Sequence, residues 1–153
     1  MRCLFSLALA MILLVACRPE DPLADPPPFV EILACHENTN LDSLSLRQAM
    51  LGQWNWHYVR CQNGPDQSRT ASSSITYLDI SPDTIGLWPE NSLDPIADAT
   101  WSLERRNASL FVLGTDPLIV APDLEGQVIV CDPWLVINRS YRNFCDIYYK
   151  KRE

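Results

Sequence analysis

Side chains that commonly carry catalysis are sparse in this sequence. The chain has only two histidines, His36 and His57, and it contains no Gly-x-Ser-x-Gly, His-Glu-x-x-His or glycine-rich phosphate-binding motif. Carboxylates are numerous, but they fall at the ends of expected strands and in turns, where carboxylates are most often solvated. Examples are Asp79, Asp83, Asp98, Glu104, Asp132 and Asp146. We therefore expect a protein that is not an enzyme and that has no cofactor.

The N-terminus carries residues suited to a different chemistry, lipid attachment. Arg2 precedes an almost unbroken apolar run, residues 4–16. At ~1.5 Å per residue this run covers roughly 20 Å, less than the ~30 Å hydrocarbon core, so residues 1–16 form a signal peptide. Ala16 directly before Cys17 resembles the lipobox of bacterial lipoproteins. That resemblance implies that acylated Cys17 attaches the mature protein to a lipid bilayer; the alternative is an ordinary signal peptide with an incidental cysteine.

A tether follows the lipidated cysteine. Residues 18–29 read RPEDPLADPPPF and are rich in proline and acidic side chains, which cannot form a core. An extended segment of this length spans roughly 35–40 Å. We assign residues 17–34 to the lipidated cysteine and tether, and residues 35–153 to one domain.

The charge balance restricts the partners. The chain has 12 basic and 19 acidic residues, a formal net charge of −7, which argues against nucleic acid and against electrostatic docking on anionic lipid. In enteric bacteria an aspartate after the lipidated cysteine is an inner-membrane retention signal; Arg18 stands there instead, which implies the outer membrane. The acidic residues that follow resemble the surface-export signal of Bacteroidetes lipoproteins, so the periplasmic and surface faces both stay open.

Strand signals recur at short spacing through the domain. Residues 42–51 (DSLSLRQAML) predict a short helix that ends at Gly52, with Ser45 and Gln48 at capping-box spacing. Residues 31–40 show no clear periodicity. The expected strands are 51–61, 74–80, 84–88, 98–105, 109–114, 127–131, 134–138 and 144–150. Eight short strands joined mostly by short turns predict an all-β, antiparallel up-and-down barrel, with a β-sandwich or another small barrel as the alternative.

The start and end of the domain add a family resemblance. A short helix that runs into Gly52-Gln53-Trp54 resembles the lipocalin signature, and the run from Leu46 to Arg152 is similar to the lipocalin-like lipoproteins of Bacteroidetes. The resemblance implies that the helix closes one end of the barrel and that Gly52 and Trp54 form its floor. It also implies a basic partner for Trp54 near the end of the last strand, for which we expect Arg152.

The barrel topology predicts how the cysteines pair. Four cysteines in an exported chain most simply form two disulfides, and the absence of a Cys-x-x-Cys pair argues against a metal site. Cys61 ends the first strand and Cys145 begins the last, at the same end of neighbouring strands. Cys131 ends the sixth strand at the other end, where Cys35 lies just before the helix. We therefore expect Cys61–Cys145 and Cys35–Cys131.

The aromatic residues of the first strand are compatible with two functions, depending on whether they line a cavity or fill the barrel. Alternation predicts that Trp54, Trp56 and Tyr58 share one face and point inward. The expected inward set is Trp54, Trp56, Tyr58, Leu78, Ile80, Trp101 and Leu103, with either Ile147 and Tyr149 or Tyr148. If a cavity remains, the protein binds a small hydrophobic ligand, and the candidate ligand-binding residues are Trp56, Tyr58, Trp88, Trp101 and Tyr149. If side chains fill the barrel, it is an interaction module, either an accessory subunit of an envelope complex or an inhibitor.

Overall fold

Strand β1 (Gly52–Arg60) pairs with β3 (Tyr77–Ile80) along one edge and with β9 (Asp146–Lys151) along the other, which closes the sheet into a barrel. The structure is a computed structural model that describes residues 26–62, 67–68, 77–89, 92–107, 110–119, 124–142 and 144–152. The strands between β3 and β9 are β4 (Thr84–Trp88), β5 (Ala97–Arg105), β6 (Phe111–Asp116), β7 (Gly126–Cys131) and β8 (Trp134–Asn138). Neighbours in sequence are antiparallel neighbours in space, so the predicted eight-stranded up-and-down barrel is confirmed.

Two minor elements complete the sheet and its connections. The two-residue strand β2 (Gln67–Ser68) pairs with the last part of β1, and a 3₁₀ turn, Ser140–Arg142, lies between β8 and β9. The β3–β4 turn is closed by Ser81, whose hydroxyl accepts from the Thr84 backbone N–H at 3.0 Å. β6 and β7 pair at only two described positions, Val112 with Gln127 and Leu113 with Gly126.

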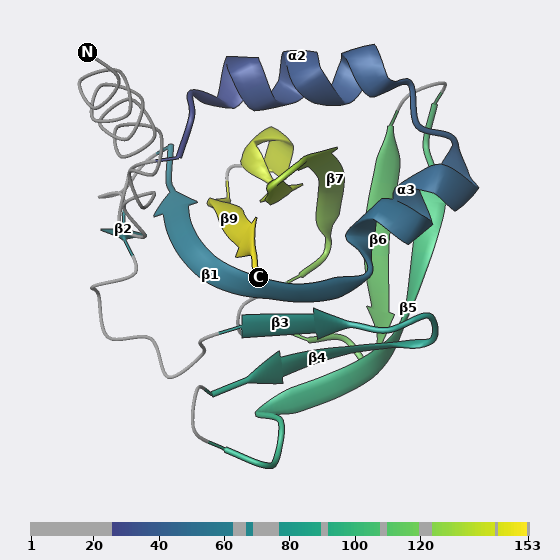
Figure 1. Ribbon diagram of the computed structural model, residues 1–153, viewed down its shortest axis with the longest axis vertical. Helices are drawn as coiled ribbons and strands as arrows, with labels where there is room; N and C mark the ends of the chain where they lie inside the picture. The colour runs from purple at the N-terminus through teal and green to yellow at the C-terminus, as the bar shows by residue number, and fades with distance from the viewer. Residues whose placement is uncertain are drawn as a thin grey trace, which may run out of the picture.

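Helix α3 (Ser43–Met50) closes the end of the barrel where β1 begins (Figure 1). Its N-cap is Asp42, whose carboxylate accepts from the Ser45 backbone N–H at 2.7 Å. The expected capping box at Ser45 and Gln48 is therefore wrong, because Asp42 already accepts from the first turn. Leu46 and Met50 are fully buried and point into the barrel, which holds this short helix in place.

A second helix, α2 (Phe29–Thr39), lies in the segment where no periodicity was found, and it begins within the range expected to be tether. It covers the outside of the barrel at β7, β8 and β9 (Figure 1). Its buried residues Ile32 and His36 are four apart and share one face. The Val130 backbone N–H, beyond the short β6–β7 pairing, donates to Nδ1 of His36 at 3.2 Å.

Both predicted disulfides are confirmed. Cys35 of α2 is bonded to Cys131 at the end of β7, with 5.7 Å between Cα atoms. Cys61, just after β1, is bonded to Cys145, just before β9, with 4.2 Å between Cα atoms. One bridge therefore attaches α2 to the barrel wall, and the other joins the two strands that close the barrel.

The predicted signal peptide, Cys17 and the first part of the tether lie outside the described residues. Among the residues that the structure does describe, no helix is both long and apolar enough to cross a bilayer.

Candidate functional site

Three of the five candidate ligand-binding residues, Trp56, Trp101 and Tyr149, lie inside the barrel. Trp56 and Tyr149 face each other across β1 and β9. Trp101 lies near α3, where its indole N–H donates to the Ser81 carbonyl at 2.8 Å. The predicted positions of these three residues are therefore confirmed, and the space around them decides what they do.

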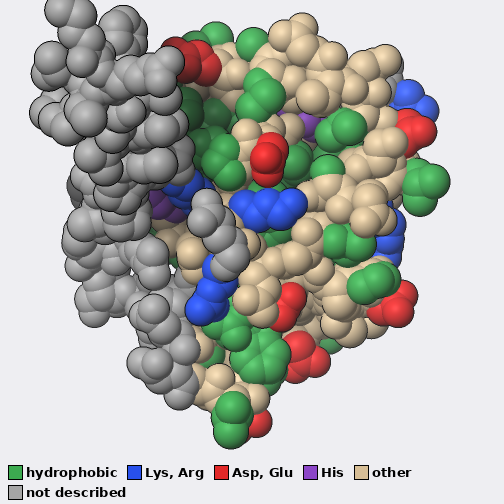
Figure 2. All heavy atoms as spheres, viewed as in Figure 1, with side chains coloured by type: hydrophobic (Ala, Val, Ile, Leu, Met, Phe, Trp, Pro, Cys, Tyr) green, Lys and Arg blue, Asp and Glu red, His purple; other side chains and the backbone are tan. Residues whose placement is uncertain are grey.

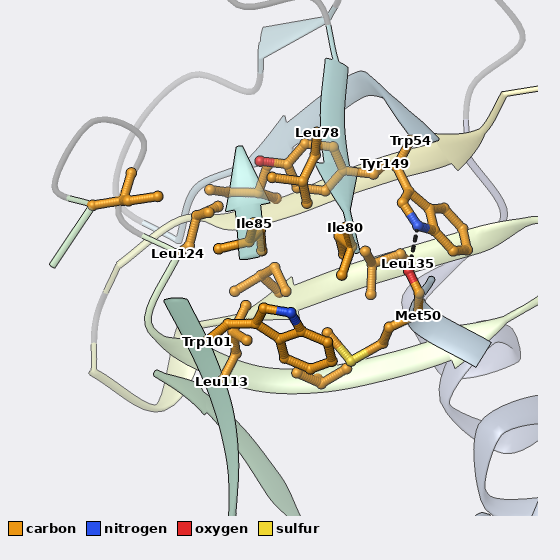
Figure 3. Packing of buried hydrophobic residues seen from close by; sticks show 14 of the residues in the cluster. Met50, Trp54, Leu78, Ile80, Ile85, Trp101, Leu113, Leu124, Leu135 and Tyr149 are labelled. Atoms are coloured by element: carbon orange, nitrogen blue, oxygen red, sulfur yellow. Dashed lines mark hydrogen bonds between the residues drawn. The ribbon is translucent and has the colours of Figure 1, made fainter. Parts of the chain in front are cut away.

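The described interior is filled by side chains. Figure 3 shows residues from β1, β3, β4, β5, β6, β8 and β9 converging, together with Met50 of α3 and Leu124 of the β6–β7 connection. The buried side chains of this cluster are 0–6% exposed. A side chain that lines a ligand cavity keeps surface that water can touch, so no ligand-sized space adjoins these residues.

Both ends of this core are closed. Leu46 and Met50 of α3 close it where β1 begins. Ile119 and Leu124 come from the β6–β7 connection, which the strand directions place at the opposite end, and both are buried in the same cluster. Thr115 supports this connection by accepting from the Ile119 backbone N–H at 3.0 Å.

Tyr58 is a correction: it does not point into the barrel. The pairing of β1 with β9 shifts between Trp56 and Tyr58, which marks a β-bulge at His57. The extra residue turns Tyr58 to the outer face, where it packs with Tyr148 in the cluster under α2. The predicted inward wall of three aromatic rings is therefore reduced to Trp54 and Trp56.

The barrel floor contains Gly52 and Trp54 as expected. Gly52 has a φ of +116°, a backbone conformation that favours glycine, and it directs the chain from α3 into β1. Trp54 is buried, and its indole N–H donates to the Met50 carbonyl at 2.7 Å (Figure 3). This bond joins the first strand to the end of the helix that closes the barrel.

Arg152 is the second correction, because the basic partner of Trp54 is Lys151. Trp54 and Lys151 are paired in the sheet, and the ammonium lies 5.3 Å from the Trp54 ring centre. Arg152, one residue later, lies over the outer-face residue Tyr77 at 4.9 Å. Alternation along the last strand gives the reason, since only Lys151 is on the face of Trp54.

Arg47 is a floor residue that the sequence reasoning missed. Its guanidinium lies 4.0 Å from the Trp101 ring centre, and it also donates to the Pro82 carbonyl. It thereby connects α3 to β5 and to the β3–β4 turn. The available signal was that Arg47 is the only basic residue within the helix.

Trp88, also a candidate ligand-binding residue, is a further correction: it lies on the outer face of the barrel and not in its interior. Its neighbour Leu87 points inward, so Trp88 and Gly86 point outward. The indole stacks with Tyr77, at 6.2 Å between ring centres and 6° between planes. A Cβ at Gly86 would lie 2.7 Å from the Trp88 indole nitrogen, so the glycine lets the indole lie across β4.

This arrangement forms a surface groove of about 360 Å³, which we call the Trp88 groove. Its lining residues are Asp79, Ser81, Thr84, Gly86, Trp88, Pro95 and Asp98. In Figure 2, acidic side chains lie over the lower part of the molecule, where Figure 1 places β3, β4 and β5. A volume of this size is within the range of ligand and side-chain sites.

A second surface groove, of about 470 Å³, carries the opposite charge, and we call it the Arg142 groove. It is lined by Arg106, Leu110, Val112, Gln127 and Arg142. Arg106 pairs with Glu104 at 2.9 Å, and Arg142 pairs with Glu125 at 3.0 Å. The charges of this groove are therefore already compensated by neighbouring carboxylates.

Several titratable side chains are buried in the part of the chain that the structure describes. No group of three or more His, Cys, Asp or Glu residues there could hold a metal ion. His57 is buried at the bulge with its ring edge-on to Trp134, 5.0 Å between ring centres. Burial raises the pKa of Tyr149 well above its usual range, so its hydroxyl stays protonated inside the barrel.

Comparison of the chain with protein-family models, with curated proteins and with solved structures finds no match.

Proposed function

We propose that this chain is a lipid-anchored protein of the bacterial outer membrane whose filled barrel acts through its outer surface. It serves as a non-enzymatic interaction module, either an accessory subunit of an envelope complex or an inhibitor. The observation that carries the proposal is the filled interior, in which buried cluster side chains are 0–6% exposed. A barrel without space for a ligand has its loops and outer face left for recognition.

Rigidity supports the same proposal. The two disulfides fix α2 and the closure between β1 and β9. Residues presented on such a scaffold lose little conformational freedom when a partner binds, which favours affinity. The two grooves on the outer face, one with acidic side chains and one with basic side chains already paired to carboxylates, supply surfaces for such contacts.

One observation favours the second candidate, a barrel that binds a small hydrophobic ligand. The Tyr149 hydroxyl is fully buried and has no hydrogen-bond partner among the described residues. Buried hydroxyls normally have a partner, so a ligand atom could supply one after the interior rearranges.

Fluorescence separates the two candidates. The full mature chain in mild detergent is titrated with fatty acids, bile acids, haem and a retinoid-like probe, while tryptophan emission is recorded. The interaction module predicts no saturable change, with Tyr149→Phe as the matched control. A saturable change in the wild type that Tyr149→Phe weakens would establish the ligand-binding function and overturn the filled-barrel proposal.

Crosslinking tests the positive part of the proposal. A photo-crosslinking amino acid is placed at one exposed position on the outer face of the barrel in living cells. The control variant carries it at Leu44 of α3, which is also exposed. An adduct of one defined mass from the outer face, absent from Leu44, is expected.

Mass spectrometry of the mature protein tests the anchor, because Cys17→Ser should remove the diacylglycerol mass and release the protein from membranes.

A further inference from the structure

The β4–β5 loop presents apolar side chains beside the Trp88 groove. Leu93 is 96% exposed and Ile96 is 47% exposed. Residues 92–96 of this loop are nevertheless held by hydrogen bonds: the Asp94 backbone N–H donates to the Ser92 hydroxyl at 3.1 Å, and the Ile96 N–H donates to the Leu87 carbonyl at 2.7 Å. Neighbouring exposed apolar side chains beside a groove, unlike a single exposed leucine, are a feature of interaction sites.

Two carboxylates flank the floor of the groove. Asp79 of β3 and Asp98 of β5 are the sheet partners of Gly86 on its two sides. With neighbouring strands ~4.8 Å apart, their Cα atoms are roughly 10 Å apart, and the Trp88 indole lies over Gly86 between them. Asp79 accepts from the neutral Gln53 amide at 3.1 Å, and among the described residues neither carboxylate has an ion pair. The groove therefore carries two uncompensated negative charges.

Trp88 provides an aromatic wall to these carboxylates. The stack with Tyr77 fixes the plane of the Trp88 indole. The guanidinium of Arg152 lies over the Tyr77 ring of this stack and not over Trp88. An indole beside carboxylates attracts an organic cation through both the ring quadrupole and Coulomb interaction.

We propose that the Trp88 groove and residues 92–96 of the β4–β5 loop form the docking surface for a protein partner. The partner stacks an arginine or lysine side chain on the Trp88 indole, flanked by Asp79 and Asp98, and packs apolar neighbours of that residue on Leu93 and Ile96. This inference rests on the proposed interaction function and assigns it a surface and a partner chemistry. Charge complementarity carries it, because the Arg142 groove has its charges paired and the Trp88 groove does not.

The geometry favours a basic side chain over other occupants. The two carboxylates stand on alternate strands and do not form a group that could hold a metal ion. A planar guanidinium has donors on several sides and stacks on an indole, so it suits the space between separated carboxylates. A neutral saccharide would also contact Trp88 but would leave both charges uncompensated.

The test uses N-acetyl-arginine amide as the probe and N-acetyl-citrulline amide, its neutral analogue, as the control. Binding to the full mature chain in detergent is followed by NMR at the Trp88 indole N–H. We expect the arginine amide to shift this signal and Asp79→Asn and Asp98→Asn each to weaken binding by about fivefold. Asp132→Asn, at an exposed turn outside the groove, should leave binding unchanged.

The apolar part of the surface is tested separately. Acetyl-Leu-Arg-Leu amide should bind more tightly than acetyl-Ser-Arg-Ser amide, and Leu93→Ser should remove that difference without changing the binding of the arginine amide alone. Equal binding of the citrulline amide, binding of N-acetylglucosamine at the same signal, or no binding of the arginine amide at millimolar concentration would each overturn the proposal. These failures leave the filled barrel untouched, whereas ligand uptake in the fluorescence titration would contradict the proposed function itself.

Discussion

Trp56 and Tyr58 are separated by one residue in β1, yet their side chains lie on opposite faces of the barrel wall. Trp56 packs inside the barrel against the interior cluster, and Tyr58 packs outside it against the ring of Tyr148, at 5.9 Å between ring centres. The bulge at His57 produces this difference.

The bulge predicts unequal costs of truncation. Trp56→Ala should lower the free energy of unfolding by about 3–5 kcal/mol, because it leaves a cavity in a filled core. Tyr58→Ala should cost clearly less, since Tyr58 is only partly buried. Denaturant unfolding of both variants measures the costs, and a larger cost at Tyr58 would contradict the outward position.

The barrel floor predicts that substitutions of the neighbouring basic residues Lys151 and Arg152 have different effects on Trp54. Lys151→Ala should change the NMR shift of the Trp54 indole and cost about 0.5–1 kcal/mol of stability, because its ammonium lies over that ring. Arg152→Ala should leave the Trp54 signal in place and affect Tyr77 instead. The reverse pattern would restore Arg152 as the partner of Trp54.

The disulfides predict two different kinds of loss. Replacing Cys35 and Cys131 by serine should cost on the order of 2–5 kcal/mol and should speed amide hydrogen exchange first in α2, which that bridge holds. Replacing Cys61 and Cys145 should instead speed exchange at the paired ends of β1 and β9. Exchange that rises uniformly in both variants would show that the bridges act only on global stability.

Tyr149→Phe should raise stability by about 1 kcal/mol, because it removes a buried hydroxyl without a described partner. Burial raises the pKa of Tyr149 in the folded state, so the unfolded state ionises first. Titration of Tyr149 therefore leaves the free energy of unfolding unchanged below the unfolded pKa of about 10 and lowers it as the pH rises above that value. Unfolding between pH 8 and 11 should show a smaller decline for Tyr149→Phe than for the wild type.

Asp42 predicts a dependence on acid pH. Hydrogen bonds from the Ser45 backbone and then its side chain hold the pKa of Asp42 below its usual value of about 3.8. The cap therefore contributes stability above that value, and the contribution is lost as the pH falls through the lower, folded pKa. Asparagine also caps helices but does not titrate, so Asp42→Asn should lose less stability than the wild type between pH 5 and 2. Matching acid profiles would contradict this role.

Alternation and turn chemistry predict most of the barrel. The expected strands 84–88 and 134–138 have the bounds of β4 and β8, because clear turns delimit them. The connection order then places the cysteines well enough to predict both disulfides. Helix α2 escaped prediction because its buried face combines Ile32 with His36, and a histidine does not extend an apolar stripe.

The misplaced site residues have local causes that a sequence does not reveal. A bulge carries no residue signature at His57, yet it reverses the side on which Tyr58 lies. One position of register separates Lys151 from Arg152 and decides which one reaches Trp54. The filled interior depends on Ile119 and Leu124 folding inward from a connection, and periodicity says nothing about connections.

The bond between Cys35 and Cys131 also decides how the domain responds to mechanical force. A pull on the chain ahead of Phe29 enters at α2, and the disulfide transmits it directly into β7, one of the three strands that α2 covers. The force reaches β1 only after that covalent crossing, so the closing pair of β1 and β9 is not peeled apart from its end. A domain pulled from the chain ahead of Phe29 would thus move as one piece, with its outer face undistorted.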